Sequence, residues 1–190
     1  MTLEEVVSQL ESQFQVLKKI EFRSEITLEL SLDKIAHACC FSKEQLKFNF
    51  LSDLSSVDNF GEEPRFEVVY ELYSLETHVH LRLKTRVSED HLEVPSVSHL
   101  WPTANWHERE IYDMMGIRFS NHPDLRRILM WEGYPYYPLR KDFPLEGKPS
   151  DLPEVAFTKT APLAGGPFVA SPSDSGAKDR EPRARHPEEL

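Results

Sequence analysis

The 190-residue chain is poor in cysteine and in glycine. It has two cysteines, the adjacent Cys39 and Cys40, and its seven glycines form no GxGxxG or GxxxxGK pattern. Two thiols cannot supply a four-thiolate iron–sulfur or structural zinc site, and neighbours on a helix point about 100° apart. We therefore expect buried, reduced cysteines and no glycine-rich phosphate loop.

Long hydrophobic runs are also missing. No stretch approaches the roughly 18 apolar residues that span a bilayer, and the N-terminus lacks the basic region and apolar core of a secretory signal, so we expect neither element. The net charge is −10. Residues 1–100 carry ten basic against eighteen acidic side chains, whereas residues 101–148 carry seven of each. An acidic body argues against nucleic acid or anionic lipid as a direct partner.

The first hundred residues alternate between helical and strand periodicity. Apolar residues at three- and four-residue spacing predict helices, and strict alternation predicts strands. The patterns give a helix over 2–19, a strand over 25–31, a helix over 33–41, a strand over 46–57, paired strands over 66–73 and 78–87, and a short helix over 95–101. Residues 51–54 also fit a helix. This order predicts an α+β fold with helices packed on a largely antiparallel sheet and a long extended C-terminal arm.

A helix over residues 104–115 is the centre of the sequence. Asn105 can cap it with Glu108 at capping-box spacing, or Thr103 can cap it directly after Pro102. Gly116 follows where a left-handed C-terminal residue is favoured.

Three consecutive charges make this helix unusual. Glu108, Arg109 and Glu110 span about 200° of its circumference, so at least one charge should face packed protein. A buried charge needs a partner. Candidate partners are Arg126, Arg127, Arg140, Asp113, Asp124 and Asp142. We expect Arg109 and either Arg126 or Arg127 to form bidentate pairs with carboxylates.

Residues 116–148 combine frequent prolines with many large apolar side chains. The prolines exclude regular helix or central strand, yet the aromatic content is too high for a disordered loop. We therefore expect 1–115 to be a globular domain and 116–148 an extended arm that docks on a partner protein. Residues 149–190 are proline-rich, and we expect a partly mobile tail.

Catalytic and metal-binding interpretations are weaker than structural ones. His107-Glu108 begins like a zinc-protease HExxH motif, but its fifth position is Ile111. His78 and His80 could chelate a metal from one strand face, although two solvated histidines are favoured. Glu108 and Glu110 could act as general acid and base, but their arginine neighbour favours an ion-pair network. Aromatic and basic residues over 126–141 could mimic an RNA surface, which the interleaved acids oppose.

Four stretches carry a family resemblance: Glu108-Arg109-Glu110, then Tyr112 to Ile117 with Phe119, then His122 to Leu129, and finally Pro138 to Leu145. Together they resemble the signature of the 30 kDa subunit of the proton-pumping NADH–quinone oxidoreductase, respiratory complex I. The sequence departs from that signature at Asn121, where a glycine is expected, and at Tyr136-Tyr137.

The resemblance implies a cofactor-free subunit of the peripheral arm, with FMN and iron–sulfur clusters in partner subunits. The implied partners are the quinone-pocket (49 kDa-type) subunit and the adjacent iron–sulfur subunit. The implied place is the cytoplasmic face of the inner (plasma) membrane of a bacterium, rather than the mitochondrial matrix side, with membrane contact only through the complex. It gives structural and interface roles, not catalytic ones, to Trp106, Glu108, Arg109, Glu110, Asp113, Gly116, His122, Arg126, Arg127, Arg140 and Asp142.

Two other functions stay open. One is the equivalent subunit of a related membrane-bound hydrogenase or of a complex with another electron donor. The other is a free-standing soluble enzyme that uses the region of Glu108 and His122.

Overall fold

A five-stranded mixed sheet forms the centre of the computed structural model, which describes residues 2–148. The chain divides into two compact units, residues 1–141 and 142–190. The helices and strands are α1 (Leu3–Gln13), β1 (Val16–Phe22), β2 (Glu25–Leu30), α2 (Ile35–Glu44), β3 (Phe50–Asp58), β4 (Phe66–Tyr73), β5 (His80–Val87), the 3-10 helix η1 (Glu89–His91), β6 (Glu93–Pro95), α3 (Ala104–Met115) and β7 (Arg118–Ser120).

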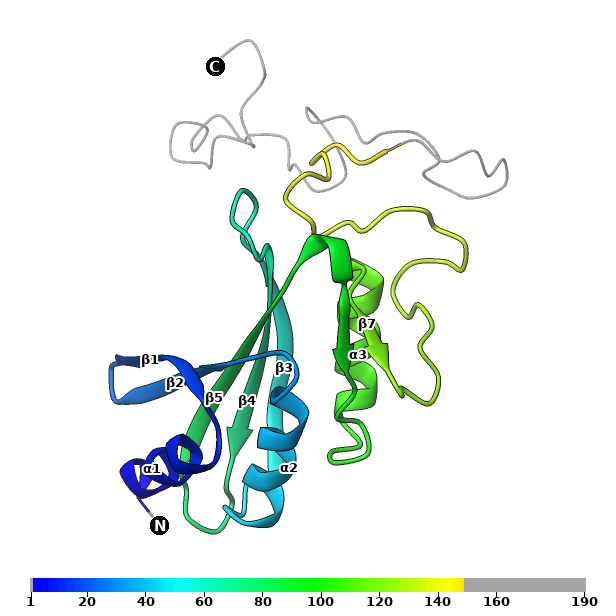
Figure 1. Cartoon of the computed structure of the whole chain (residues 1–190). Coiled ribbons are helices and arrows are strands. Elements are labelled where there is room, and N and C mark those ends of the chain that lie inside the picture. Colours follow the sequence, from blue (N-terminus) through cyan, green and yellow to red (C-terminus); the bar gives the residue numbers. More distant parts are fainter. Residues whose placement is uncertain (1, 149–190) are drawn as a thin grey trace, which may run out of the picture. The chain divides into compact units, whose positions relative to one another are not determined.

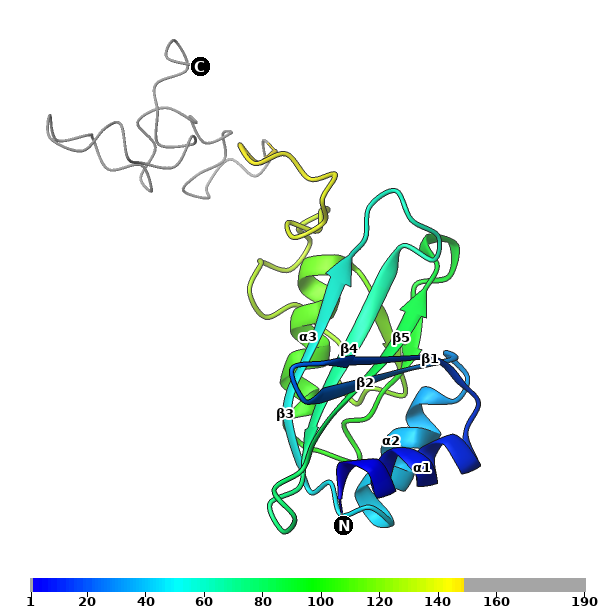
Figure 2. The ribbon, with the colours of Figure 1, turned by 90° about the vertical axis from the view of Figure 1, so that its left-hand side faces the viewer.

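The sheet has the order β1-β2-β5-β4-β3, and all its pairs are antiparallel except β2 with β5. Figure 2 shows the β1–β2 hairpin running across the direction of the other three strands. A second, two-stranded sheet pairs β6 with β7 in parallel. The structure thus confirms the α+β class and the largely antiparallel sheet.

Alternation along β5 gives this strand an apolar and a charged face. In β5 the odd positions from Leu81 to Val87 are buried, whereas His80, Arg82, Lys84 and Arg86 are half-buried on the other side. The apolar face joins the core cluster that also contains buried residues of α1, α2 and α3. Figure 1 shows these three helices together with the strands of the sheet. This alternation was predicted from the sequence.

The first helix is shorter than predicted. Thr2 and Glu5 form a capping box at its start, and the helix ends at Gln13 instead of residue 19. The next residues form β1, which pairs with β2. The two strands are joined by a turn at Arg23 and Ser24, both of which have positive φ. A two-residue turn of this kind matches the twist of a hairpin, so strand pairing overrides the helical spacing of the apolar side chains.

The predicted helix over 95–101 is also wrong. Pro95 ends the short strand β6, and residues 98–100 form a turn. Backbone pairing of β6 with the distant β7, a strand that was not predicted, decides the conformation. The predicted strand over 46–57 exists as β3 but starts at Phe50, while Leu46 and Phe48 are buried before it.

The two cysteines are free; Cys39 is fully buried and Cys40 partly so. Burial raises the pKa of the Cys39 thiol well above its ordinary value. Within residues 2–148, no helix combines the length and hydropathy needed to cross a membrane. Residues 149–190, for which a mobile tail was predicted, lie outside the described residues.

Candidate interface on helix α3 and the anchored loop

Helix α3 spans Ala104–Met115, as predicted, but its start differs from the predicted capping box. Thr103 is the N-cap residue and makes no side-chain capping bond. Glu108 cannot serve as the acidic member of a capping box with Asn105 because its side chain points into the core, where it is fully buried.

The carboxylate of Glu108 binds the turn that precedes the helix. Its oxygens accept hydrogen bonds from the Ser96 hydroxyl at 2.6 Å and from the Val97 backbone N–H at 2.7 Å. Burial raises the pKa of Glu108 to about 7, although these two hydrogen bonds oppose the rise. The prediction that an arginine pairs with Glu108 is therefore wrong, because the donors to this carboxyl group are the neutral Ser96 hydroxyl and Val97 N–H.

His122 lies beside Glu108 and ties the following loop to the start of α3. Its side chain is fully buried, with Nε2 at 3.1 Å from the carbonyl oxygen of Asn105 and 3.8 Å from Glu108 Oε2. Its Nδ1 accepts a hydrogen bond from the backbone N–H of Asp124. An accepting Nδ1 leaves the proton on Nε2, so this geometry fits the neutral ring.

Residues 121–141, which we call the anchored loop, are held in the middle by Asp113 of α3. Oδ2 of Asp113 accepts hydrogen bonds from three consecutive backbone N–H groups, those of Ile128, Leu129 and Met130, at 2.9, 2.6 and 2.9 Å. Arg127 Nη1 lies 2.5 Å from its Oδ1. Burial opposes ionisation of Asp113, but these donors outweigh it and lower its pKa. A carboxylate on α3 thus fixes a stretch with no regular structure.

The last carbonyls of α3 are also capped by the anchored loop. A helix end leaves carbonyl oxygens without partners inside the helix, and cations are favourable there. The carbonyl oxygens of Asp113, Met114 and Met115 accept hydrogen bonds from Arg127, the Leu139 backbone and Arg140 at 2.9, 3.2 and 2.7 Å.

Gly116 makes this close approach possible. It is left-handed, with φ +80°, as predicted, and a Cβ there would lie 2.6 Å from Arg140 Nη2 and 2.7 Å from the Tyr137 ring. Arg140 also stacks over Tyr137, 4.5 Å from the ring centroid. Asn121, where the sequence resemblance leads us to expect a glycine, adopts a positive φ of 62°. Asparagine tolerates this conformation better than most residues.

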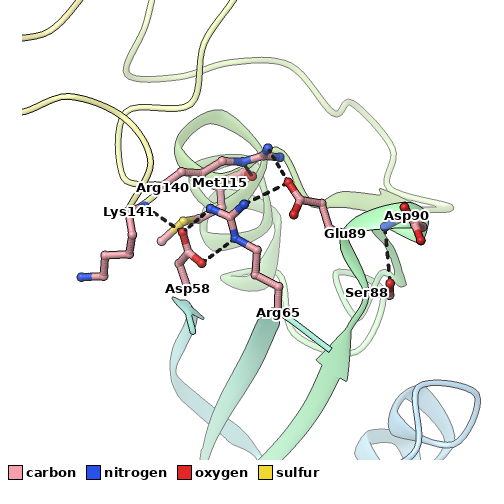
Figure 3. Close-up of polar contacts among 8 residues, drawn as sticks. All are labelled: Asp58, Arg65, Ser88, Glu89, Asp90, Met115, Arg140 and Lys141. Atoms are coloured by element: carbon pink, nitrogen blue, oxygen red, sulfur yellow. Dashed lines mark hydrogen bonds and ion pairs between the residues drawn. The ribbon is translucent and has the colours of Figure 1, made fainter. Parts of the chain in front are cut away.

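A buried ion pair at the end of the sheet receives the end of the anchored loop (Figure 3). Arg65 donates two parallel hydrogen bonds to Asp58, each of 2.8 Å, and a third to Glu89. The Lys141 backbone N–H donates to Asp58 Oδ2 at 2.7 Å. The bonds from Arg65 lower the pKa of Asp58, although burial opposes them.

This pair was not predicted from the sequence. Asp58 and Arg65 flank the turn between two predicted strands, and Asp58 pairs with Phe66 across the hairpin. The placement of an acidic and a basic residue on the two sides of this turn was the sequence signal that could have predicted the pair.

The arginine pairs differ from the prediction. Arg109 donates to the backbone carbonyls of Arg126 and Arg127, at 3.1 and 3.5 Å, and not to a carboxylate. Arg126 makes one contact with Asp124, and both side chains are exposed. Of these three arginines, only Arg127 pairs with a buried carboxylate, and it does so through one nitrogen.

Two further predicted site residues are Glu110 and Asp142. Glu110 is exposed and lines a shallow groove between α3 and β3 with Asp53 and His107. Asp142 begins the second compact unit. The structure therefore brings together Glu108 with His122, Asp113 with Arg127, and Gly116 with Arg140.

Three large apolar side chains of this region point into solvent. Trp106, Leu129 and Leu139 are 63%, 61% and 55% exposed. They belong to α3 and to the anchored loop, which the hydrogen bonds of Asp113 and Arg140 hold together. Across residues 2–148, no group of three His, Cys, Asp or Glu side chains could hold a metal ion. Helix α3 and the anchored loop thus carry large apolar side chains that face solvent, a feature that docking surfaces share.

Residues 28–149 match the family model described as the 30 Kd subunit of respiratory-chain NADH dehydrogenase. The chain therefore belongs to this family. The match begins within β2, after α1 and β1, and includes β3, β4, β5, α3 and the anchored loop.

Two curated relatives illustrate the similarity, and both are named as subunits of NADH-quinone oxidoreductase. The relative from Rhizobium etli is 57% identical over 117 residues, which are 60% of this chain and 62% of that protein. The relative from Geotalea uraniireducens is 48% identical over 132 residues, covering 70% of this chain and 80% of the relative. The chain thus spans somewhat less than two thirds of the Rhizobium protein.

Two solved structures share the fold. The trypsin-resistant fragment of Nqo5 is 30% identical with a TM-score of 0.59, and the match covers 66% of this chain and all of the fragment. A chain of the membrane-bound sulfane sulfur reductase, an archaeal respiratory membrane complex, is 26% identical with a TM-score of 0.66. That match covers 75% of this chain and 85% of the other.

Proposed function

We propose that this chain is a structural subunit of the peripheral arm of an NADH–quinone oxidoreductase, where it supports the subunit that forms the quinone pocket. In this function it binds no cofactor itself, and FMN and iron–sulfur clusters in partner subunits carry electrons from NADH to quinone, coupled to proton translocation. The partners are the 49 kDa-type subunit and the adjacent iron–sulfur subunit, at the cytoplasmic face of a bacterial inner membrane.

The observation that carries the proposal is the combination of internal anchoring with outward apolar side chains. Asp113 and Arg140 bind the anchored loop to α3 within the chain. Leu129 lies in the stretch held by Asp113, yet its side chain is 61% exposed. A loop that is fixed before binding loses little conformational freedom on docking, which favours association.

The family membership supports the assignment to this complex. The curated relatives are named as subunits of NADH-quinone oxidoreductase, and the matched region contains α3 and the anchored loop. In a subunit that docks without catalysing a reaction, we expect the buried charged residues to stabilise the conformation of the docking segment. In agreement, Glu108, Asp113 and Arg140 all bind backbone groups of their own chain.

The test replaces one exposed leucine on the proposed surface and a matched one elsewhere. Leu129→Asp should reduce co-purification of the neighbouring subunits and quinone reductase activity together, because it places a charge at the centre of an apolar contact. Leu75→Asp is the control, since Leu75 is 57% exposed in the β4–β5 turn. Equal retention of partners by both variants would contradict the proposal. A free-standing enzyme would instead turn over substrate as an isolated monomer.

The similarity to the archaeal sulfane sulfur reductase chain favours a second function. Its TM-score is 0.66, compared with 0.59 for the Nqo5 fragment. The same module could serve a related complex with another electron donor, such as a membrane-bound hydrogenase. Mass identification of the electron-input subunits that co-purify in mild detergent separates the two functions.

A further inference from the structure

Arg109 is a buried cation without a carboxylate partner among residues 2–148. It is 7% exposed, and its guanidinium donates to the backbone carbonyls of Arg126 and Arg127. Its guanidinium carbon also lies 4.9 Å from the centroid of the Trp106 ring. Carbonyl dipoles and a ring face stabilise a cation only in part, and a buried charge normally has an opposite charge beside it.

Other arginines in this region do have carboxylate partners. Arg127 is paired with the buried Asp113, and Arg126 with the exposed Asp124. Arg109 therefore has the one guanidinium of this group that lacks an anion within the described chain, although its side chain is nearly fully buried beside Trp106.

Arg109 opens into a groove beside α3. The groove is lined by Trp106, Arg109, Arg126, Arg127, Ile128 and Glu132. Three of these side chains are cationic and one is anionic. The groove has an apolar rim because Trp106 is 63% exposed at its edge. Its charge, shape and position on the proposed docking surface all suit an acidic group that arrives with an apolar neighbour.

We infer that this groove binds a carboxylate of a neighbouring subunit, an Asp or Glu side chain or a chain terminus, which completes the ion pairing of Arg109. The inference rests on the proposed function, because it assumes that this surface docks on a protein. The planar guanidinium of Arg109 can hold a carboxylate through parallel hydrogen bonds while its ring contact with Trp106 persists.

A protein carboxylate fits the groove better than a polyanion. Glu132 lines the same groove and would repel a dense run of phosphates. The whole chain carries a net charge of −10, which disfavours nucleic acid or an anionic membrane as the occupant. A single carboxylate brings only one negative charge, so both repulsions are weaker for it than for a polyanion.

Zero-length crosslinking in the assembled complex tests the inference. Arg126→Lys places an amine at the mouth of the groove, and Arg126 is exposed enough for this change to leave the fold intact. Treatment of the purified complex with a water-soluble carbodiimide should then join position 126 to an Asp, a Glu or a C-terminus of a neighbouring subunit through an amide. Mass spectrometry of the digested complex identifies both ends. Arg23→Lys, at the β1–β2 turn, should give no link to that carboxylate.

Three results would overturn the inference. One is a link from position 126 only to Asp124 or Glu132 of the same chain. Another is no link at all in a complex that remains assembled. The third is binding of the chain to vesicles of an anionic phospholipid that is abolished by Arg126→Glu. The first two would leave the proposed docking function intact, whereas loss of partners in Leu129→Asp tests that function separately.

A charge-reversal variant gives an independent measure. Arg126→Glu should weaken retention of the neighbouring subunit at least about tenfold at low salt, and Arg126→Gln by less, because like charges then face each other across the groove. Equal retention in the two variants would count against a carboxylate at this site.

Discussion

Charged side chains serve two different ends on the outer sheet face and on α3. On the sheet face, Arg82 pairs with Glu71 and Glu25, and Lys84 pairs with Glu67. These are contacts between two side chains, and the basic members are 23–29% exposed. On α3, the fully buried carboxylates bind backbone N–H groups instead.

The difference teaches which charges determine a conformation. A pair of flexible side chains in partial contact with water can rearrange at small cost, so it contributes little to stability. A buried carboxylate that accepts from backbone N–H groups fixes the chain itself, and removal leaves unsatisfied donors. We therefore expect large effects from changes near α3 and small ones on the sheet face.

Removal of the Asp113 carboxylate should give the largest effect. Asp113→Ala leaves three backbone donors and Arg127 without their acceptor, which should lower the free energy of unfolding by about 4 kcal/mol. Urea denaturation of the full chain at neutral pH measures it. Asp124→Ala is the matched control, since its pair with Arg126 is exposed, and should change stability by less than about 0.5 kcal/mol. Similar values for both variants would remove the basis of the comparison.

The next effect concerns pH and Glu108. Its folded-state pKa of about 7 lies above the ordinary value of 4.5, so the folded protein holds this proton more tightly than the unfolded chain. Stability from this group is complete below about pH 4.5 and is lost as pH rises through about 7, by about 3 kcal/mol. Urea titrations at acid and alkaline ends of this window should show the loss in the natural chain and not in Glu108→Gln. An equal slope in the two proteins would contradict the assignment.

A smaller loss should follow Gly116→Ala. The new Cβ would meet Arg140 and the Tyr137 ring in addition to the cost of a left-handed conformation, together about 2–3 kcal/mol. Gly133→Ala is the control: Gly133 has φ +88° but no atom within 4 Å of an added Cβ. It should cost about 1 kcal/mol, from the backbone alone. Thermal unfolding of both variants separates the cost of the backbone conformation from the cost of the close approach. An equal loss of stability in the two variants would mean that the contact with Arg140 contributes nothing.

Local signals in the sequence were sufficient for the elements whose pattern and neighbours agree. The alternation of β5 and the glycine after α3 predicted their structures correctly. The helical spacing up to Leu17 failed, because the Arg23-Ser24 turn and pairing with β2 make residues 16–22 a strand. Partners distant in the chain decide such cases.

For the charged side chains on α3, the sequence predicted that charges would be buried better than it predicted which groups they contact. The sequence indicated buried charges on α3 and ion pairing with the later arginines; Arg127 pairs with Asp113, but through one nitrogen and not through the expected two. It could not show that Glu108 turns to the Ser96–Val97 backbone, because backbone donors are invisible in side-chain patterns. Residues 116–141 also belong to the first compact unit, and whether they dock on a partner stays a prediction.

The smallest effect is expected on the outer sheet face, and it decides whether the comparison holds. Arg82→Ala removes two ion pairs, yet it should lower the free energy of unfolding by only about 0.5 kcal/mol, because Glu71 remains 16% exposed to water and near His80. Urea denaturation at low and high salt measures the loss, which should shrink as salt screens the pairs. A loss above about 2 kcal/mol that persists in high salt would mean that the strand pairs act as one network. The sheet face would then hold the fold as firmly as the backbone-bound charges of α3.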